Sequence, residues 1–211
     1  MKHKSKYNAA LIAVSAMFAA LLVGGKEALA ALPNVEVVTL LIAICAYVWG
    51  PLVVFPAVNV FIAVDMAIWG VNTWIISYFI HWNTVAIIYW LLSKLQYRFA
   101  GRHKAVEVTI VTLAAAIITT LFGVLTSAVD TLVGYTGKGF FVDGDNFLAR
   151  FSAMYVAGSS FYVTQIVCNI VLFATAFTPL VTLNRKAQLR MSPKDTSSDE
   201  TNSKAEEQSN E

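Results

Sequence analysis

The sequence predicts an all-α membrane protein with six transmembrane helices. Three observations lead to this fold class. Of the 211 residues, 57% are hydrophobic and only 13% are charged, with a mean hydropathy of +0.64, which is too apolar for an ordinary soluble domain. Long apolar runs alternate with short breaks that contain glycine, proline or charged residues. Lys and Arg gather in those segments that six crossings would place on one side of a membrane.

The apolar runs set the expected spans, because a helix needs about 20 residues to cross the hydrocarbon. The second run is short and is separated from the third only by Gly50 and Pro51, so it could instead be the tail of a longer bent segment. We expect one domain over residues 1–184, followed by a polar, disordered cytoplasmic tail over 185–211. The six predicted spans cover residues 8–31, 35–49, 51–69, 73–93, 106–133 and 154–183.

The first span imitates a signal peptide, with the basic head "MKHKSK", an apolar middle and an "ALA-A" exit. Lys26 and Glu27 interrupt the cleavage region, and further spans follow. We therefore expect an uncleaved first helix.

Orientation follows from the positive-inside rule. With six spans both termini share a side, and of the 15 Lys and Arg residues only Lys26, Lys138 and Arg150 fall on the other side. The sequence thus predicts cytoplasmic termini, with the breaks near residues 28–36, 69–74 and 134–151 facing outward.

Polar and aromatic side chains gather in the outward halves of the predicted helices. At about 100° per residue, those of each span fall within one arc of the helix surface. In the sixth span these are Tyr155, Ser159, Tyr162, Gln165 and Asn169; in the fourth, Trp74, Tyr78, His81 and Trp82; in the fifth, Thr119, Gly123, Thr126 and Asp130; in the third, Asp65 and Trp69.

Converging stripes of this kind predict a cavity that opens outward, with aromatic walls and a few hydrogen-bonding groups, as in small-molecule sites. Each stripe also has an alternative reading. The tryptophans could form an interfacial belt, and Gln165 and Asn169 could hold neighbouring helices together. His81 could be a satisfied hydrogen-bonding residue, and Asp65 and Asp130 could lie shallow enough to be hydrated.

The sequence contains no recognisable catalytic set, nucleotide-binding loop or zinc-ligand spacing, so we predict no enzymatic activity, cofactor or metal. Cys45 and Cys168 lie in apolar runs and read as packing residues. Asp143 and Asp145 form only a fragment of a calcium loop and are expected to belong to a turn.

Small residues form a ridge on the first span, at spacings of i, i+4, i+7 and i+11. Its members are Ala9, Ala13, Ala16 and Ala20. Such a ridge lets another helix approach closely. The spacing favours packing within the chain, and the alternative is a docking surface for a separate membrane subunit.

Four stretches together resemble a substrate-binding S component of an energy-coupling factor (ECF) vitamin transporter. They are "NAALIAVSAMFAAL", "LPNVEVVTLLI", "WGVNTWIISYFIHW" and "FYVTQIVCNIVLFATAFTPL", which span most of residues 8–183. The resemblance implies a six-helix subunit of a prokaryotic plasma membrane that captures a vitamin or related micronutrient from outside. It also implies partners: a transmembrane coupling protein, which the alanine ridge would contact, and two cytoplasmic ATPases, with membrane lipid around them and no nucleic acid.

The break between the first two spans fits this interpretation. Pro33 biases the preceding residues out of helix, which would let Asn34 and Glu36 project into the pocket mouth. Alternatively, Asn34 is an N-cap and Glu36 lies in the first turn, where it complements the helix dipole. The full set of expected substrate contacts is Asn34, Glu36, Asp65, Trp69, Asn72, Trp74, Tyr78, His81, Trp82, Asp130, Tyr155, Tyr162, Gln165 and Asn169.

The main rival is a self-sufficient secondary transporter or channel for a small organic solute. Such proteins usually show internal repeats and charged residues at the membrane midplane, and neither is clear here. Because so few outward Lys and Arg residues are available to bind an anion, a neutral or weakly charged solute is expected.

Overall fold

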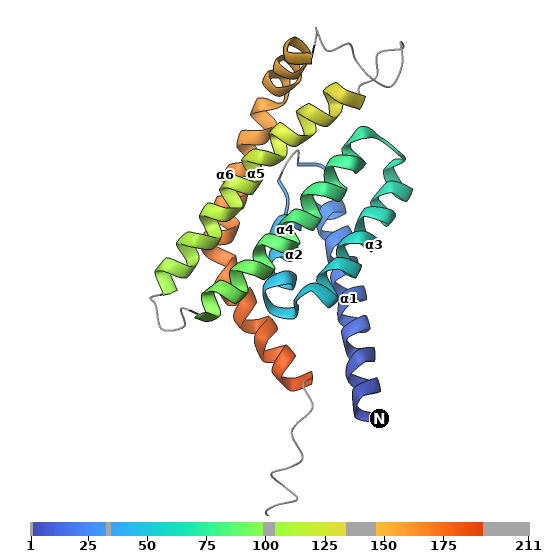
Figure 1. Cartoon of the computed structure of the whole chain (residues 1–211), viewed down its shortest axis with the longest axis vertical. Helices are drawn as coiled ribbons and strands as arrows, with labels where there is room; N and C mark the ends of the chain where they lie inside the picture. Colours follow the sequence, from blue (N-terminus) through green and yellow to red (C-terminus); the bar gives the residue numbers. More distant parts are fainter. Residues whose placement is uncertain (1, 33–34, 99–103, 134–146, 192–211) are drawn as a thin grey trace, which may run out of the picture.

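A computed structural model of the chain describes residues 2–32, 35–98, 104–133 and 147–191 (Figure 1). Over these residues the chain is all-helical, as predicted. The helices are α1 (Lys2–Ala28), α2 (Val38–Trp49), α3 (Pro51–Trp69), α4 (Thr73–Arg98), α5 (Lys104–Val133) and α6 (Phe147–Met191).

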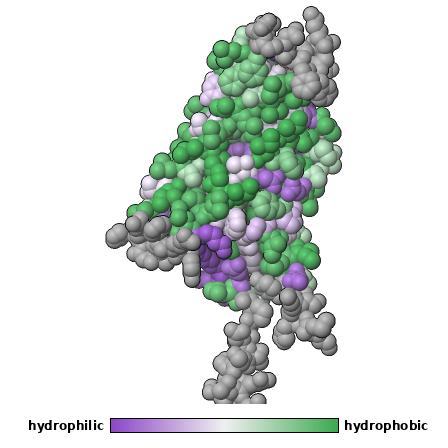
Figure 2. Space-filling view, in the orientation of Figure 1, coloured by the Kyte–Doolittle hydropathy of each residue, from purple (hydrophilic) through white to green (hydrophobic). Residues whose placement is uncertain are grey.

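The helices carry the apolar surface that a membrane protein needs. Five of them are long and apolar enough to cross a membrane, whereas α2 is equally apolar but has only 12 residues. Apolar residues cover most of the face seen in Figure 2. The start of α1 and the end of α6 lie toward the same end of the bundle (Figure 1). These features indicate a membrane-embedded protein.

Two glycines make the tight turns around α3. Gly50 and Gly70 have φ angles of 78° and 81°, a left-handed conformation that glycine adopts without steric cost. Each glycine N–H caps the helix before it, bonding to the carbonyl of Ala46 or of Met66. Pro51 follows at the start of α3, where its missing N–H costs nothing. The break predicted between the second and third helices is therefore a single-residue turn.

The short helix α2 lies at the centre of the bundle and packs against α1, α3, α4 and α6. Every residue from 42 to 47 is buried. Beside its C-terminal half, aromatic rings pack closely: the centroids of Tyr47 and Phe177 are 5.3 Å apart, and those of Tyr89 and Phe173 are also 5.3 Å apart. This cluster forms the apolar core.

Helix α6 is longer than the sequence predicted, running from Phe147 to Met191 rather than over 154–183. The expected tail therefore begins as helix, and its residues from 192 onward lie outside the described part of the chain. The added turns "RKAQLRM" consist of good helix formers. They are also held by α2, since the Gln188 side-chain amide donates to the Val48 carbonyl at 2.9 Å.

The alanine ridge of α1 faces away from the rest of the chain. Its four alanines are exposed, whereas Val14, Phe18 and Leu22 on the opposite face are buried in the core. Packing within the chain, which the spacing alone favoured, is therefore wrong for the described residues. The face is free for lipid or for another protein.

Candidate binding pocket

A cavity of about 420 Å³ opens at the end of the bundle where α1 and α3 end and α4 begins. The segment between α1 and α2 closes one side of it, and α5 and α6 contribute one residue each. Its lining residues are Lys26, Glu27, Leu29, Ala30, Leu32, Val35, Glu36, Val38, Trp69, Asn72, Trp74, Tyr78, Trp82, Phe122 and Gln165.

One wall of the cavity is a ladder of aromatic rings on α4. Trp74, Tyr78 and Trp82 are spaced four residues apart, which places them on one face of the helix. The ring centroids of Trp74 and Tyr78 are 4.9 Å apart, and those of Tyr78 and Trp82 are 5.7 Å apart. Phe122 of α5 extends this wall, with its ring 6.0 Å from that of Tyr78. The wall suits a flat organic molecule.

An ion pair lies between α1 and α3 at the rim. The Lys26 ammonium, in the last turn of α1, lies 2.5 and 2.6 Å from the two carboxylate oxygens of Asp65. Asp65 is almost fully buried, at 2% exposure of its side chain. The same ammonium lies over the rings of Trp74 and Tyr78, 5.0 and 4.8 Å from their centroids. The ion pair and the two cation–π contacts therefore all stabilise the Lys26 ammonium in this position.

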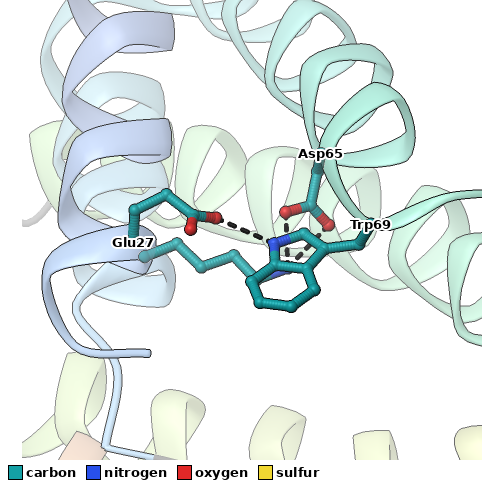
Figure 3. A network of polar contacts seen from close by, with 4 residues as sticks. Glu27, Asp65 and Trp69 are labelled. Carbon is teal, nitrogen blue, oxygen red and sulfur yellow. Dashed lines mark hydrogen bonds and ion pairs between the residues drawn. The ribbon is translucent and has the colours of Figure 1, made fainter. Parts of the chain in front are cut away.

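A second contact joins the same two helices. The Trp69 indole N–H donates to a carboxylate oxygen of Glu27 at 2.9 Å. Figure 3 shows Glu27 reaching from α1 toward Asp65 and Trp69 on α3. These contacts position the ends of α1 and α3 against each other at the pocket rim.

Glu36 lies deeper, just before α2, and accepts several hydrogen bonds. One of its carboxylate oxygens accepts from the Thr39 hydroxyl at 2.5 Å, from the Gln165 amide at 3.3 Å and from the Asn169 amide at 3.4 Å. Its other oxygen accepts the Thr39 backbone N–H at 3.3 Å. The donors come from α2 and α6, so Glu36 links these helices at the inner end of the cavity.

The start of α2 corrects one expectation. Glu36 does not lie in the first turn, because α2 begins at Val38 with Val37 as its cap residue. Val37 has no side-chain oxygen, and the structure gives α2 no side-chain cap from it. The Glu36 carboxylate supplies the acceptor instead, so its stabilising role at the helix N-terminus is retained. Asn34, the expected N-cap and pocket residue, lies outside the described residues.

Several buried polar atoms at this end of the bundle have no hydrogen-bond partner among the described residues. Two belong to the cavity lining: the indole N–H of Trp82 and the side-chain carbonyl of Gln165, on residues only 3% and 4% exposed. Three more lie nearby, on Ser77, His81 and Asn169. A buried polar group without a partner costs about 1–3 kcal/mol, so these atoms require water or a solute.

Many of the side chains predicted to contact substrate come together here. Those that line the cavity are Glu36, Trp69, Asn72, Trp74, Tyr78, Trp82 and Gln165. Three others contact lining residues from behind. Asp65 accepts from the Lys26 ammonium, and the Asn169 amide donates to the Glu36 carboxylate. The His81 ring packs against the rings of Trp82 and Phe122, with centroid distances of 4.6 and 4.4 Å.

Asp130, Tyr155 and Tyr162 are not among the lining residues. Asp130 accepts a short hydrogen bond from the Thr73 hydroxyl, which ties α5 to the start of α4. The Tyr162 hydroxyl pairs with that of Ser127 at 3.0 Å, and the Tyr155 ring packs against the Tyr162 ring. The two tyrosines belong to a part of α6 that lies alongside α5 (Figure 1). At Tyr155 and Tyr162 the predicted arc faces α5, whereas at Gln165 it reaches the cavity.

The sequence reasoning missed Lys26, Glu27, Thr39 and Phe122. The two charges were visible at the end of the first apolar run, but nothing in the sequence indicated that they meet Asp65 and Trp69 of α3. Thr39 and Phe122 are ordinary residues of apolar helices and carried no signal. No group of three His, Cys, Asp or Glu side chains able to hold a metal occurs in the part of the chain described. Cys45 and Cys168 are free, and Asp143 and Asp145 lie outside the described residues.

The fold and the cavity together define an all-helical membrane protein with an aromatic pocket of solute size at one end of the bundle. No known protein family, curated protein or solved structure matches the chain.

Proposed function

We propose that this protein captures a vitamin-like micronutrient outside the cell, as the substrate-binding S component of an ATP-driven ECF importer. The observation that carries the proposal is the cavity, because aromatic walls and unpartnered buried polar atoms converge on it. Small-molecule sites of about 300–1,000 Å³ have this composition. Water could form hydrogen bonds with the unpartnered polar atoms, but it would not pack favourably against the aromatic rings. An organic solute could do both. The rings are those of Trp74, Tyr78, Trp82 and Phe122.

The direction of capture follows from charge. The Lys and Arg distribution supports a cytoplasmic location for the start of α1 and the end of α6. The cavity lies at the opposite end of the bundle, beside the C-terminal end of α1, so in this orientation it would open to the outside. The described residues hold no nucleotide-binding loop, so energy for release would come from partner ATPases.

The exposed alanine ridge supports a partner in the membrane. Small side chains let helix backbones approach closely, which is how membrane helices associate where burial of apolar surface gives no advantage over lipid. All four alanines of the ridge on α1 are exposed. It fits the coupling subunit that the resemblance implies.

The first experiment tests capture. The detergent-purified full chain is analysed by native mass spectrometry for a retained small molecule, whose affinity is then measured for the wild type and for Trp74→Leu, Gln165→Leu and Asn169→Leu. We expect each substitution to weaken binding about tenfold or more, because it removes a ring contact or a hydrogen bond made in a desolvated site. Unchanged affinity in all three variants would refute the placement of the site.

The second experiment separates an S component from a solitary transporter. We expect Ala13→Leu with Ala16→Leu to abolish cellular uptake and partner association, while binding of the retained molecule is unchanged. Ala174→Leu is the matched control, because Ala174 is exposed on α6 outside the ridge. Full uptake by the ridge variant would favour a self-sufficient secondary transporter, which has no partner to lose.

A further inference from the structure

The charges around the cavity do not balance. Its lining contains Lys26, Glu27 and Glu36, and Asp65 lies directly behind Lys26. The Lys26 ammonium is neutralised by Asp65 at 2.5 Å, which is the one ion pair among the described residues. Glu27 and Glu36 therefore remain without a cationic partner in that part of the chain.

From this imbalance we infer that the captured solute is an organic cation, an inference that rests on the proposed capture function and names its substrate class. Inside a membrane protein the effective dielectric constant is low, so two unpaired carboxylates at one cavity weigh heavily on the charge of its occupant. An anion would be repelled by both. A cation would supply the counter-charge that they lack.

The carboxylate of Glu36 is arranged for such a role. All four of its hydrogen-bond donors, from Thr39, Gln165 and Asn169, are neutral groups, so they orient the carboxylate without cancelling its charge. The Gln165 side-chain carbonyl beside it has no partner and adds a second acceptor. Two acceptors therefore converge at the inner end of the cavity, where a positively charged N–H group would be bound.

Lys26 shows what this wall of the pocket favours. Its ammonium is held by the faces of Trp74 and Tyr78 together with a carboxylate, which is the arrangement that recognises organic cations. Trp82, the next ring of the ladder, is not used by Lys26 and has an unpartnered indole N–H. The geometry thus points to a flat cation.

The sequence predicted a neutral or weakly charged solute, because few outward Lys and Arg residues are available to bind an anion. In the structure Lys26 is paired with Asp65, and the carboxylates of Glu27 and Glu36 add negative charge to the cavity lining. These contacts favour a cation instead.

Three probes with the same indole ring and different charge test the inference: tryptamine, a cation; tryptophol, neutral; and indole-3-acetate, an anion. Each is titrated calorimetrically into the detergent-purified full chain. We expect tryptamine to bind about tenfold more tightly than tryptophol, and indole-3-acetate not to bind. Equal or tighter binding of the neutral or anionic probe, or no binding of tryptamine, would overturn the inference.

Variants tie the preference to the two carboxylates. We expect Glu27→Gln and Glu36→Gln each to reduce the preference for tryptamine over tryptophol several-fold. Glu107→Gln is the matched control, because Glu107 bonds to the Tyr47 hydroxyl outside the cavity lining and should leave the ratio unchanged. An unchanged ratio in Glu27→Gln and Glu36→Gln would also contradict the assignment.

Glu36→Gln places an amide among donors and could fail to fold. Glu27→Gln keeps the oxygen that accepts from Trp69, so it provides the test by itself in that case. The two proposals fail differently. A neutral or anionic molecule retained by the purified protein would refute the cation while leaving capture intact, whereas the absence of any retained molecule would count against capture.

Discussion

The two ends of the helical bundle treat their polar groups in opposite ways. At the core end, polar side chains around the Tyr47, Tyr89 and Phe173 rings have partners, apart from the Thr112 hydroxyl of α5. The Tyr47 hydroxyl donates to Glu107 at 2.7 Å, the Tyr89 hydroxyl donates to the Val111 carbonyl at 2.7 Å, and the Trp49 indole donates to Asn184 at 3.2 Å. At the pocket end, buried atoms of Ser77, His81, Trp82, Gln165 and Asn169 lack partners.

The difference suggests that the core end mainly stabilises the bundle, whereas the pocket end is arranged for a ligand. Each unpartnered buried group costs about 1–3 kcal/mol, so the pocket end is less stable alone than a fully paired version of itself would be. Proteins tolerate such local conflicts mainly at functional sites, where a ligand completes the set of contacts. The core end, where the Thr112 hydroxyl is the one such atom among the described residues, holds the helices together. Substitutions at the two ends should therefore act on different measured quantities.

The largest effect on stability is expected at the core end. Phe173→Ala removes a fully buried ring that packs on Tyr89 and Phe177, and should lower the free energy of unfolding by about 3–5 kcal/mol. Thermal and denaturant unfolding in detergent measure the loss. Phe161→Ala is the control, because Phe161 lies on the same helix at 48% exposure and should have little effect. Similar losses in both variants would break the comparison.

An intermediate effect is expected for the one ion pair of the pocket end. Asp65→Asn leaves the Lys26 ammonium without its counter-charge and should cost about 2–3 kcal/mol, less than for a pair buried on both sides because Lys26 is 24% exposed. Adding Lys26→Met should restore part of the lost stability, since no unpaired charge then remains. If the double variant is no more stable than Asp65→Asn, the loss in Asp65→Asn does not come from the unpaired charge of Lys26.

The smallest effects come from two threonines on α5. The Thr119 hydroxyl accepts from the Asn169 amide at 3.0 Å, so Thr119→Val should cost about 1–2 kcal/mol. The buried Thr112 hydroxyl has no partner among the described residues, and Thr112→Val should change stability by less than about 0.5 kcal/mol or improve it. Unfolding measured side by side gives the difference directly. Equal losses of stability would show that the Thr112 hydroxyl does form a stabilising hydrogen bond.

The sequence predicted the helices well because apolar length and turn residues decide where membrane helices begin and end. Gly50 with Pro51 and Gly70 mark breaks that any arrangement of the helices would keep. The aromatic ladder of α4 was also predictable, since the helical period alone places Trp74, Tyr78 and Trp82 on one face.

Contacts between helices were harder to predict. Periodicity says which residues of one helix share a face, but not which neighbour that face meets. Asp65, an expected substrate contact, accepts from the Lys26 ammonium, and Asp130 accepts from the Thr73 hydroxyl; periodicity predicted neither partner. Tyr162 shares its predicted arc with Gln165, yet it packs against Gly123 and Ser127 of α5.

The shortness of α2 has a consequence for how far a solute can travel. From the shared Gly50 turn, the 12 residues of α2 extend about 18 Å and the 19 residues of α3 about 28 Å. Along the helices α2 is therefore about 10 Å shorter than α3, and the cavity lies beside this difference, lined by Glu36 just before α2 and by Trp69 at the end of α3. A solute captured at Glu36, as proposed, would lie about 10 Å below the end of α3, which is about a third of a hydrocarbon layer of about 30 Å.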